Sequence, residues 1–233
     1  MASIDGPQYP GLEDGLIFCF DPKNRDCWEG GVNVKNIVLP SLTGTVDNTT
    51  ASSTEFTGAI TTEGYFNFDG TDDHVEYTND AIYQITGDIT ISGWVYLDAY
   101  DGNNDHLISK ELSYMIKANQ NSTSVPRFQI RIGTNWHTLE GGSQLSLSTW
   151  NNMIGIRDGD TMRMYINGAD IGSTTSVSGT TVSNTNPLNI ASYDGGSSYS
   201  INGRLGPCMV YNRVLSAAEV LTNYNRLKGR FGL

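Results

Sequence analysis

The stretch that decides the fold is NNMIGIRDGDTMRMYINGADI, residues 151–171. Two turn signals, Asp158-Gly159 and Asn167-Gly168, separate segments that are rich in apolar residues. Asp-Gly and Asn-Gly favour short hairpins because both turn positions must tolerate positive φ. The stretch therefore predicts three consecutive strands in an antiparallel meander. It contains no helical segment between them, which argues against a parallel βαβ topology.

Alternation with a period of two continues on both sides of this meander. Residues 89–97, ITISGWVYL, predict a long strand whose second half is apolar on both faces. The other predicted strands are Leu16–Asp21, Tyr65–Phe68, His74–Tyr77, His106–Ser109, Tyr114–Ala118, Phe128–Gly133, Asn151–Arg157, Met162–Ile166, Leu188–Ala191 and Leu205–Tyr211. Pro207 lies inside the last of these and cannot donate to a sheet, so it predicts an edge strand or a bulge. The polar stretches 43–54, 119–124 and 173–186 are expected to be long loops.

One helix is predicted near the end of the chain, at about 216–228. Ser216 and Glu219 have the spacing of a capping box, and apolar residues follow at helical spacing. We expect this helix to pack its apolar stripe on the edge of a β-sandwich. The chain is then one all-β domain over residues 15–233, preceded by an arm or loop at 1–14.

Composition and charge exclude several classes of protein. The chain has 233 residues, 14 Lys and Arg against 25 Asp and Glu, and a net charge of −11. This balance gives no cationic surface for nucleic acid or anionic membranes. No apolar run approaches the roughly 20 residues of a membrane-spanning helix, and residues 1–7 lack the features of a secretory signal. The three cysteines show no metal-binding spacing, and Cys19, in an apolar run, is expected to be buried and inert.

Seven segments resemble, in their order and spacing, the laminin G-like jelly rolls of the concanavalin A-like lectin and glucanase superfamily. They are GLIFCFD (15–21), FNFDGTDDHV (66–75), ITISGWV (89–95), LISK (107–110), WNNM (150–153), MYING (164–168) and the region 203–216. The resemblance implies an antiparallel two-sheet β-sandwich with one C-terminal helix. It also implies that Trp94 and Trp150 are packing residues.

The closing residues KGRFGL, 228–233, resemble the end of such domains in structural proteins of tailed bacteriophages. This resemblance implies a capsid decoration, tail or fibre component that is assembled in the host cytoplasm and lies on the virion surface. Its partners would be other virion proteins, host-surface glycans and, in a homo-oligomer, further copies of itself. The alternatives are a purely structural virion subunit without glycan binding, or a bacterial carbohydrate-binding adhesin module.

A glycan-cleaving enzyme is the least favoured reading. Glucanases of the superfamily use a Glu-x-Asp-x-x-Glu run, whose alternation places the carboxylates in one cleft, and this run is absent from the sequence. The three histidines are scattered, and no nucleophile motif is present. Asp105-His106 is expected to be a solvated turn. We therefore predict no catalytic residues.

Aromatic residues beside polar ones are the candidate glycan platforms, because sugars present both C–H faces and hydroxyl groups. Two groups in expected loops have this character, and their members are Trp136 with His137, and Tyr193 with Asp194 and Tyr199. The same aromatics could serve as anchors to another virion protein. The arginines on predicted strands, which are Arg127, Arg131, Arg157 and Arg163, are expected to lie on the solvent face of a sheet rather than in a groove.

Calcium is the one cofactor that the resemblance suggests. In pentraxin-like relatives the ligands come from two loops that here contain Glu111 and Asp194, one acid each, whereas calcium needs six to eight oxygens. Other acids in Asp- and Asn-rich loops are alternative contributors, namely Asp69, Asp101 and Asp105. Asp21 is expected to pair structurally with Asp69.

Overall fold

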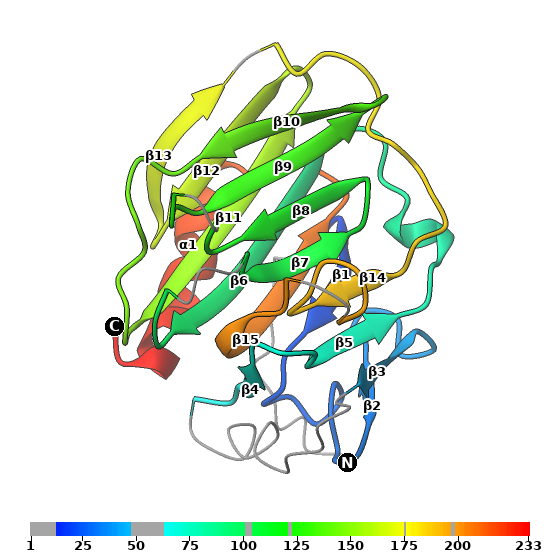
Figure 1. Ribbon diagram of the computed structural model, residues 1–233, viewed down its shortest axis with the longest axis vertical. Coiled ribbons are helices and arrows are strands. Elements are labelled where there is room, and N and C mark those ends of the chain that lie inside the picture. Colours follow the sequence, from blue (N-terminus) through cyan, green and yellow to red (C-terminus); the bar gives the residue numbers. More distant parts are fainter. Residues whose placement is uncertain (1–12, 48–62, 101–103, 121–122, 175, 197–198) are drawn as a thin grey trace.

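The computed structural model describes residues 13–47, 63–100, 104–120, 123–174, 176–196 and 199–233, and in them two antiparallel sheets are stacked face to face (Figure 1). Sheet A has the order β1 (Leu16–Phe20), β15 (Asn202–Tyr211), β6 (Ile89–Leu97), β11 (Trp150–Asp158), β12 (Thr161–Ile166) and β13 (Ala169–Thr174), with β4 (Phe66–Asp69) also paired to β15. Sheet B has the order β10 (Asn135–Glu140), β9 (Arg127–Ile132), β8 (Tyr114–Lys117), β7 (His106–Lys110), β14 (Leu188–Ile190), β5 (His74–Tyr77), β3 (Thr43–Asp47) and β2 (Asn33–Lys35). The predicted antiparallel sandwich is confirmed.

The meander of residues 151–171 forms as expected. β11 pairs with β12 and β12 pairs with β13, all antiparallel in sheet A. At the second turn Asn167 and Gly168 have φ values of 52° and 78°, the left-handed region that the Asn-Gly signal predicts. The Asn167 side chain also accepts a hydrogen bond from the Asn152 amide at 2.8 Å, which fixes the turn against β11.

The main core fills the space between the sheets. Aromatic side chains of β1, β4 and β5 meet there edge to face, with the ring centroids of Phe18 and Tyr77 4.9 Å apart and those of Phe20 and Phe66 5.4 Å apart. The three cysteines are free and buried, as expected for Cys19. A short 3₁₀ helix, η2 (Ala81–Tyr83), adds Tyr83 to this core.

A second apolar layer lies on the outer face of sheet A, and here the prediction of a helix at the sandwich edge was wrong. The helix α1 (Ala217–Lys228) begins at the predicted Ser216–Glu219 capping box and continues into a 3₁₀ turn, η3 (Gly229–Phe231). Trp94 of β6 stacks on Tyr224 and Phe231, with centroids 5.7 and 4.6 Å apart. The second half of β6 is apolar on both faces because one face packs in the sandwich and the other under this helix.

Other differences from the expectations are local. Residues 43–47 form β3 rather than a loop, whereas 48–54 lie outside the described residues. Pro207 lies at a bulge, since the register of β15 against β6 shifts between Leu205 and Cys208, and β15 is central in its sheet. Of the expected arm at 1–14, only residues 13 and 14 are described.

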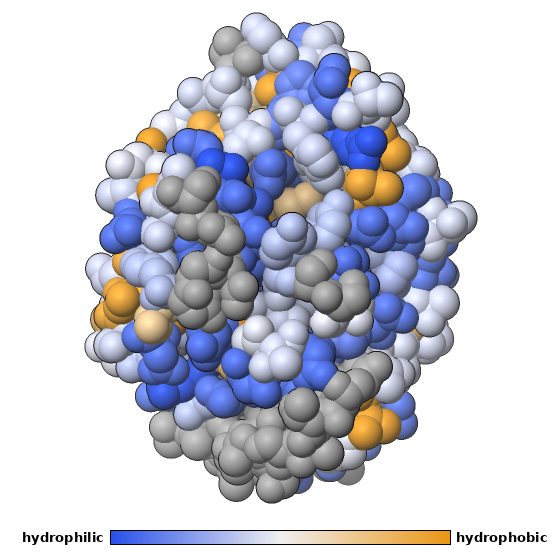
Figure 2. Space-filling view, viewed as in Figure 1, coloured by the Kyte–Doolittle hydropathy of each residue, from blue (hydrophilic) through white to orange (hydrophobic). Residues whose placement is uncertain are grey.

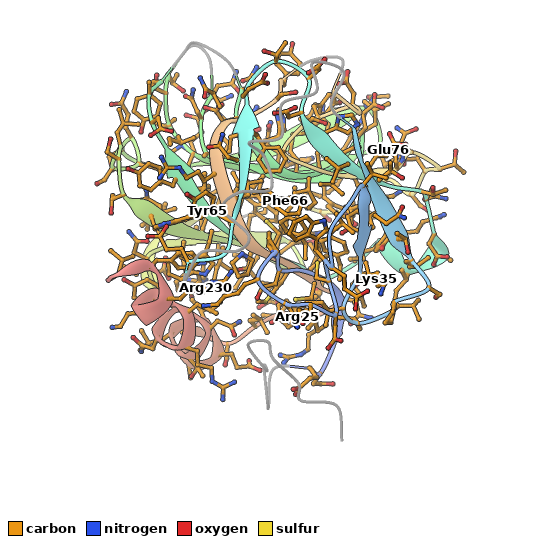
Figure 3. All side chains as sticks on the ribbon, turned by 90° about the horizontal axis from the view of Figure 1, so that it is seen from below. Arg25, Lys35, Tyr65, Phe66, Glu76 and Arg230 are labelled. Atoms are coloured by element: carbon orange, nitrogen blue, oxygen red, sulfur yellow. The ribbon has the colours of Figure 1, made fainter. Side chains whose placement is uncertain are left out.

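Asp21 forms a buried ion pair with Arg230, which lies next to α1 in Figure 3, and its expected pairing with Asp69 stays a prediction. The two guanidinium nitrogens of Arg230 donate to its carboxylate oxygens at 2.8 and 3.0 Å. The pair ties the end of the chain to the loop after β1. Among the described residues no helix is long and apolar enough to cross a membrane.

Candidate functional site

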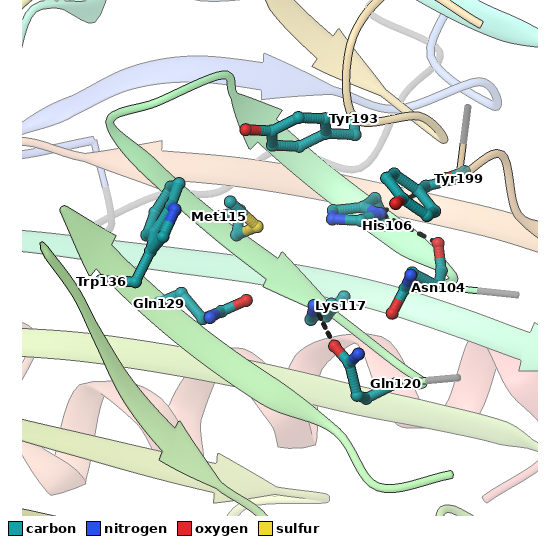
Figure 4. Close-up of a pocket in the computed structure, with 9 residues that line it drawn as sticks. All are labelled: Asn104, His106, Met115, Lys117, Gln120, Gln129, Trp136, Tyr193 and Tyr199. Atoms are coloured by element: carbon teal, nitrogen blue, oxygen red, sulfur yellow. Dashed lines mark hydrogen bonds between the residues drawn. The ribbon is translucent and has the colours of Figure 1, made fainter. Parts of the chain in front are cut away.

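A pocket of about 360 Å³ opens on the outer face of sheet B, the face turned away from α1 (Figure 4). It lies over β7 to β10 and beside the loop that follows β14. Figure 2, in which sheet B faces the viewer, shows that this face is mostly hydrophilic. The lining residues are Asn104, His106, Met115, Lys117, Gln120, Gln129, Trp136, Tyr193 and Tyr199.

Strand alternation explains why these residues face outward. In β8, Tyr114 and Ile116 are fully buried in the sandwich core, so Met115 and Lys117 point to the opposite face. In β9, Gln129 lies between two core residues and follows the same rule. The floor of the pocket is therefore made of side chains that alternate with the core.

Trp136 forms one wall of the pocket from the edge strand β10. It lies opposite Arg131 of β9, whose guanidinium carbon is 5.9 Å from the centre of the indole ring. His137 pairs with the core residue Ile130 and therefore lies on the other face of the sheet. We expected Trp136 and His137 to form one aromatic platform in a loop. This was wrong, because both residues lie in strand β10 and their side chains lie on opposite faces of sheet B.

Tyr193 and Tyr199 form the opposite wall. Their rings meet edge to face with centroids 6.1 Å apart. The carbonyl of Tyr193 accepts hydrogen bonds from Ser109 Oγ at 3.1 Å and Asn189 Nδ2 at 3.4 Å, so strands β7 and β14 hold the start of this loop. The structure thus brings Trp136, Tyr193 and Tyr199 into one pocket, whereas Asp194 is not among its lining residues.

His106 is a pocket residue, and the expectation that Asp105-His106 is a solvated turn was wrong. Both residues are buried, and the imidazole lies 5.4 and 5.9 Å from the rings of Tyr193 and Tyr199. Its Nδ1 lies 2.9 Å from the carbonyl oxygen of Asn104 and 3.3 Å from that of Tyr199. Two carbonyl acceptors require the proton on Nδ1, which leaves Nε2 as an acceptor. Burial, with a contribution from Lys117, lowers the pKa of His106 to about 3, so the ring is neutral.

Lys117 supplies the one charged side chain among the described lining residues. Its Nζ donates a hydrogen bond to Gln120 Oε1. Burial, helped by the nearby Arg127, lowers the pKa of this ammonium to about 8, so Lys117 remains a cation at pH 7. Neighbouring Gln129 donates from Nε2 to Thr138 Oγ1 at 2.8 Å and keeps its amide oxygen for a further bond. The pocket thus combines an aromatic wall with hydrogen-bond donors and acceptors.

The two acids expected to bind calcium lie at the margin of this site. Burial raises the pKa of Tyr193, and both Glu111 and Asp194 add to that rise, which places both carboxylates near the tyrosine. Glu111 Oε2 accepts from Asn186 Nδ2 at 3.2 Å. Neither acid gathers two further carboxylates, imidazoles or thiolates among the described residues. Calcium at Glu111 and Asp194 stays a prediction.

A different set of acids comes together in the turn after β4. In the described part of the chain, carboxylate oxygens of Asp69, Asp72 and Asp73 lie within 4.8 Å of one another. Two of these carboxylates also cap backbone amides, because Asp73 Oδ2 accepts from the Asp69 amide at 2.9 Å and Asp69 Oδ1 from the Thr71 amide at 2.8 Å. Asp101, another expected contributor, lies outside the described residues.

The arginines take different positions. Arg157 is buried and its guanidinium donates to Thr181 Oγ1 at 2.5 Å and to the Gly179 carbonyl, so its expected solvent exposure was wrong. It holds the 176–186 segment against β11. Arg163 is exposed and pairs with Asp170, and Arg127 pairs with Glu140 across β9 and β10.

Sequence reasoning did not identify the polar floor of the pocket. The residues that it missed are Asn104, His106, Met115, Lys117, Gln120 and Gln129. The alternation in 127–132, RFQIRI, was the available signal, because it separates polar from apolar positions, whereas 114–117, YMIK, has the apolar Met115 on the pocket side. A second cavity of similar volume lies near Leu145, Ile166 and Ile171, and none of the lining residues that the structure describes has an aromatic or ionisable side chain. It is the weaker candidate for recognition.

Similar solved structures share the fold at low sequence identity. The binding domain of Paraclostridial Mosquitocidal Protein 1 is 15% identical with a TM-score of 0.65, covering 92% of this chain and 52% of that one. Trypanosoma rangeli sialidase is 12% identical with a TM-score of 0.61, over 90% of this chain and 32% of the sialidase. A third match is domain 4 of AbnA, a GH43 extracellular arabinanase from Geobacillus stearothermophilus, solved in complex with arabinotriose. It is 13% identical with a TM-score of 0.60, and the match covers 89% of this chain and 97% of the AbnA domain.

This chain spans about half the length of the mosquitocidal binding domain and about a third of the sialidase. No curated protein matches its sequence. A family model described as the concanavalin A-like lectin/glucanases superfamily does match, over residues 69–221, which include β5 to β15 and the start of α1. With the two-sheet sandwich and C-terminal helix, this match shows that the chain belongs to the Laminin_G_3 family of that superfamily.

Proposed function

We propose that this protein is a carbohydrate-binding module without enzymatic activity, and that its site is the pocket over β7 to β10. The observation that carries the proposal is the indole of Trp136 facing a wall of Tyr193 and Tyr199 across a polar floor. An indole offers a flat apolar surface to the C–H face of a sugar. Gln129 and the Nε2 of His106 offer hydrogen bonds to hydroxyl groups.

The chemistry of the lining supports binding rather than cleavage. Glycoside hydrolysis mostly uses two carboxyl groups on either side of the scissile bond, about 5–9.5 Å apart. Among the described lining residues none is an aspartate or glutamate. The arabinotriose bound to the similarly folded AbnA domain adds support for a sugar as the ligand of such a fold.

A glycan array, followed by calorimetric titration of the best binder, tests the proposal. Trp136→Ala should weaken binding by about 30-fold or more, since truncating a tryptophan anchor costs about 2 kcal/mol. His137→Ala is the matched control, because His137 is adjacent in sequence but lies on the other face of β10. Equal losses in both variants, or an array without any binder, would overturn the proposal.

Calcium at Glu111 and Asp194 is proposed as an accessory ion. Its ligands would include the carboxylates of Glu111 and Asp194, both of which add to the raised pKa of Tyr193 beside the pocket. Removal of calcium with a chelator and the substitution Glu111→Gln should then each lower the glycan affinity. Binding that is unaffected by both would remove calcium from the account.

We propose the surface of a tailed-phage virion as the setting, with purely structural attachment as the alternative role. The resemblance of residues 228–233 to the ends of phage domains supports this setting. In the structure Phe231 of this segment packs on Trp94 and Trp150, so the segment is part of the fold. Mass spectrometry of purified particles tests the setting, and absence of the chain from every particle fraction would contradict it.

A further inference from the structure

Two lysines are buried on neighbouring strands of sheet B, and they differ in how their ammonium groups are satisfied. Lys110 of β7 is fully buried and donates to Asn79 Oδ1 at 2.9 Å and to the Asn186 carbonyl at 2.6 Å. Lys117 of β8 is only 6% exposed, and within the described residues it donates to Gln120 alone. Lys110 is absent from the pocket lining, whereas Lys117 is part of it.

The hydrogen-bond capacity of Lys117 is therefore only partly used. An ammonium carries three N–H donors, and burying a charge is costly unless acceptors or counter-charges compensate. Lys117 lies between Gln129 and Gln120, on the side of the pocket opposite Tyr193 (Figure 4). Its remaining donors are available to water or to an acceptor that a ligand brings into the pocket.

The charges around Lys117 favour an anionic acceptor. On β7, His106 is neutral. On β9 and β10, Arg127 and Glu140 form an ion pair with each other. Arg131 lies against Trp136 and adds a second cation near the pocket. Asp194 acts on His106 from outside the lining. The net charge of −11 repels anions only over the Debye length, about 8 Å at physiological salt, so local groups decide what binds.

We infer that the pocket selects sugars that carry a carboxylate, of the hexuronate or sialic acid class, and that Lys117 binds that carboxylate while Trp136 stacks on the sugar ring. The inference rests on the proposed carbohydrate-binding function and names the ligand class of the same site. A neutral sugar satisfies the indole and the amides equally well. Glu140 favours the charged form of Lys117, but its carboxylate is paired with Arg127, and the direct partner of the ammonium is the neutral Gln120. Only an acidic sugar also supplies an anion in direct contact with the ammonium.

The test uses pairs of glycans that differ only in charge. An array is printed with hexuronate and sialic acid oligosaccharides, each beside its methyl ester and neutral parent. The acidic member should bind at least tenfold more tightly than its ester, since hydrogen bonds between charged groups are the strong ones. Lys117→Met should reduce this ratio to near one, and Lys117→Arg should restore part of it.

Lys110→Met is the matched control, because it removes a buried lysine whose acceptors belong to the protein. It should lower thermal stability and leave the acid-to-ester ratio unchanged. Lys117→Gln provides a second variant should Lys117→Met fail to fold. Affinity for the acidic glycan should also fall above about pH 8, as Lys117 loses its proton, and should stay constant to higher pH in Lys117→Arg.

The outcomes separate the inference from the function on which it rests. Neutral glycans bound as tightly as acidic ones, with sensitivity to Trp136→Ala, would overturn the role of Lys117 and leave the carbohydrate-binding function in place. An acidic preference that survives Lys117→Met would also overturn that role. An array without any binder would overturn both proposals.

Discussion

Single residues of this protein are positioned by contacts that are distant in sequence. His106 shows this most clearly, because its neutral state depends on burial beneath Tyr193 and Tyr199, about 90 residues further along the chain. Nothing near Asp105-His106 in the sequence reveals these contacts, so the expectation of a solvated turn was wrong. Arg157 is similar, since its acceptors at 179 and 181 lie in a stretch that reads only as a polar loop.

The depressed pKa of His106 predicts loss of stability on mild acidification. The folded-state pKa of about 3 lies below the ordinary value near 6.5, so the unfolded chain takes up the proton first as the pH falls. The free energy of unfolding should drop by up to about 2 kcal/mol between pH 6.5 and 5.0, at about 1.4 kcal/mol per pH unit. Urea denaturation at the two pH values measures this drop.

His106→Gln should remove most of this pH dependence, since it cannot be protonated. His137→Gln serves as the control and should keep the full drop. If the wild-type protein and His106→Gln lose stability equally over this interval, the buried neutral imidazole is not its cause.

At the scale of helices and strands, local sequence signals predicted the regular elements correctly. The strand that they missed was missed for a physical reason. The hairpin at Asn167-Gly168 and the capping box of Ser216 are local signals, and both were predicted correctly. Strand β10 was not, because its sequence NWHTLE carries polar residues on both faces at a sheet edge. The sequence therefore places Trp136 in a loop, although its strand forms regular antiparallel pairs with β9.

The packing of the chain end on sheet A predicts a large effect of one substitution. Phe231 is only 7% exposed, and its ring lies 4.6 and 4.4 Å from those of Trp94 and Trp150. Phe231→Ala should cost about 3–5 kcal/mol of unfolding free energy, the usual range for removing a buried phenylalanine. Equilibrium denaturation in urea measures this cost.

Leu233→Ala is the control for this substitution, since Leu233 is 44% exposed and its loss should change stability by at most about 0.5 kcal/mol. Glycan affinity should be unchanged in both variants, because the pocket lies on the other sheet. A Phe231→Ala protein as stable as Leu233→Ala would show that η3 does not anchor the helix.

At the scale of the whole molecule, the outer faces of the two sheets differ in what covers them. The outer face of sheet A is covered by α1 and η3 and forms a second apolar core. The outer face of sheet B stays open, is mostly hydrophilic and carries the pocket (Figure 2). The fold class followed from alternation and turn signals, whereas the pocket depends on which strands are neighbours in sheet B. In that order β10, β9, β8, β7 and β14 are successive neighbours, and no single segment of the sequence predicts this arrangement.

The most direct test of the central claim is nuclear magnetic resonance of the four indole N–H groups, at Trp28, Trp94, Trp136 and Trp150. Trp94 and Trp150 lie under the helix, and Trp28 donates its indole N–H to the Gly31 carbonyl at 2.9 Å, away from the pocket. Titration with the tightest-binding glycan of the array should shift the Trp136 signal and leave the other three in place. A shift confined to Trp28, with Trp136 unmoved at saturation, would contradict the assignment of the site to the outer face of sheet B.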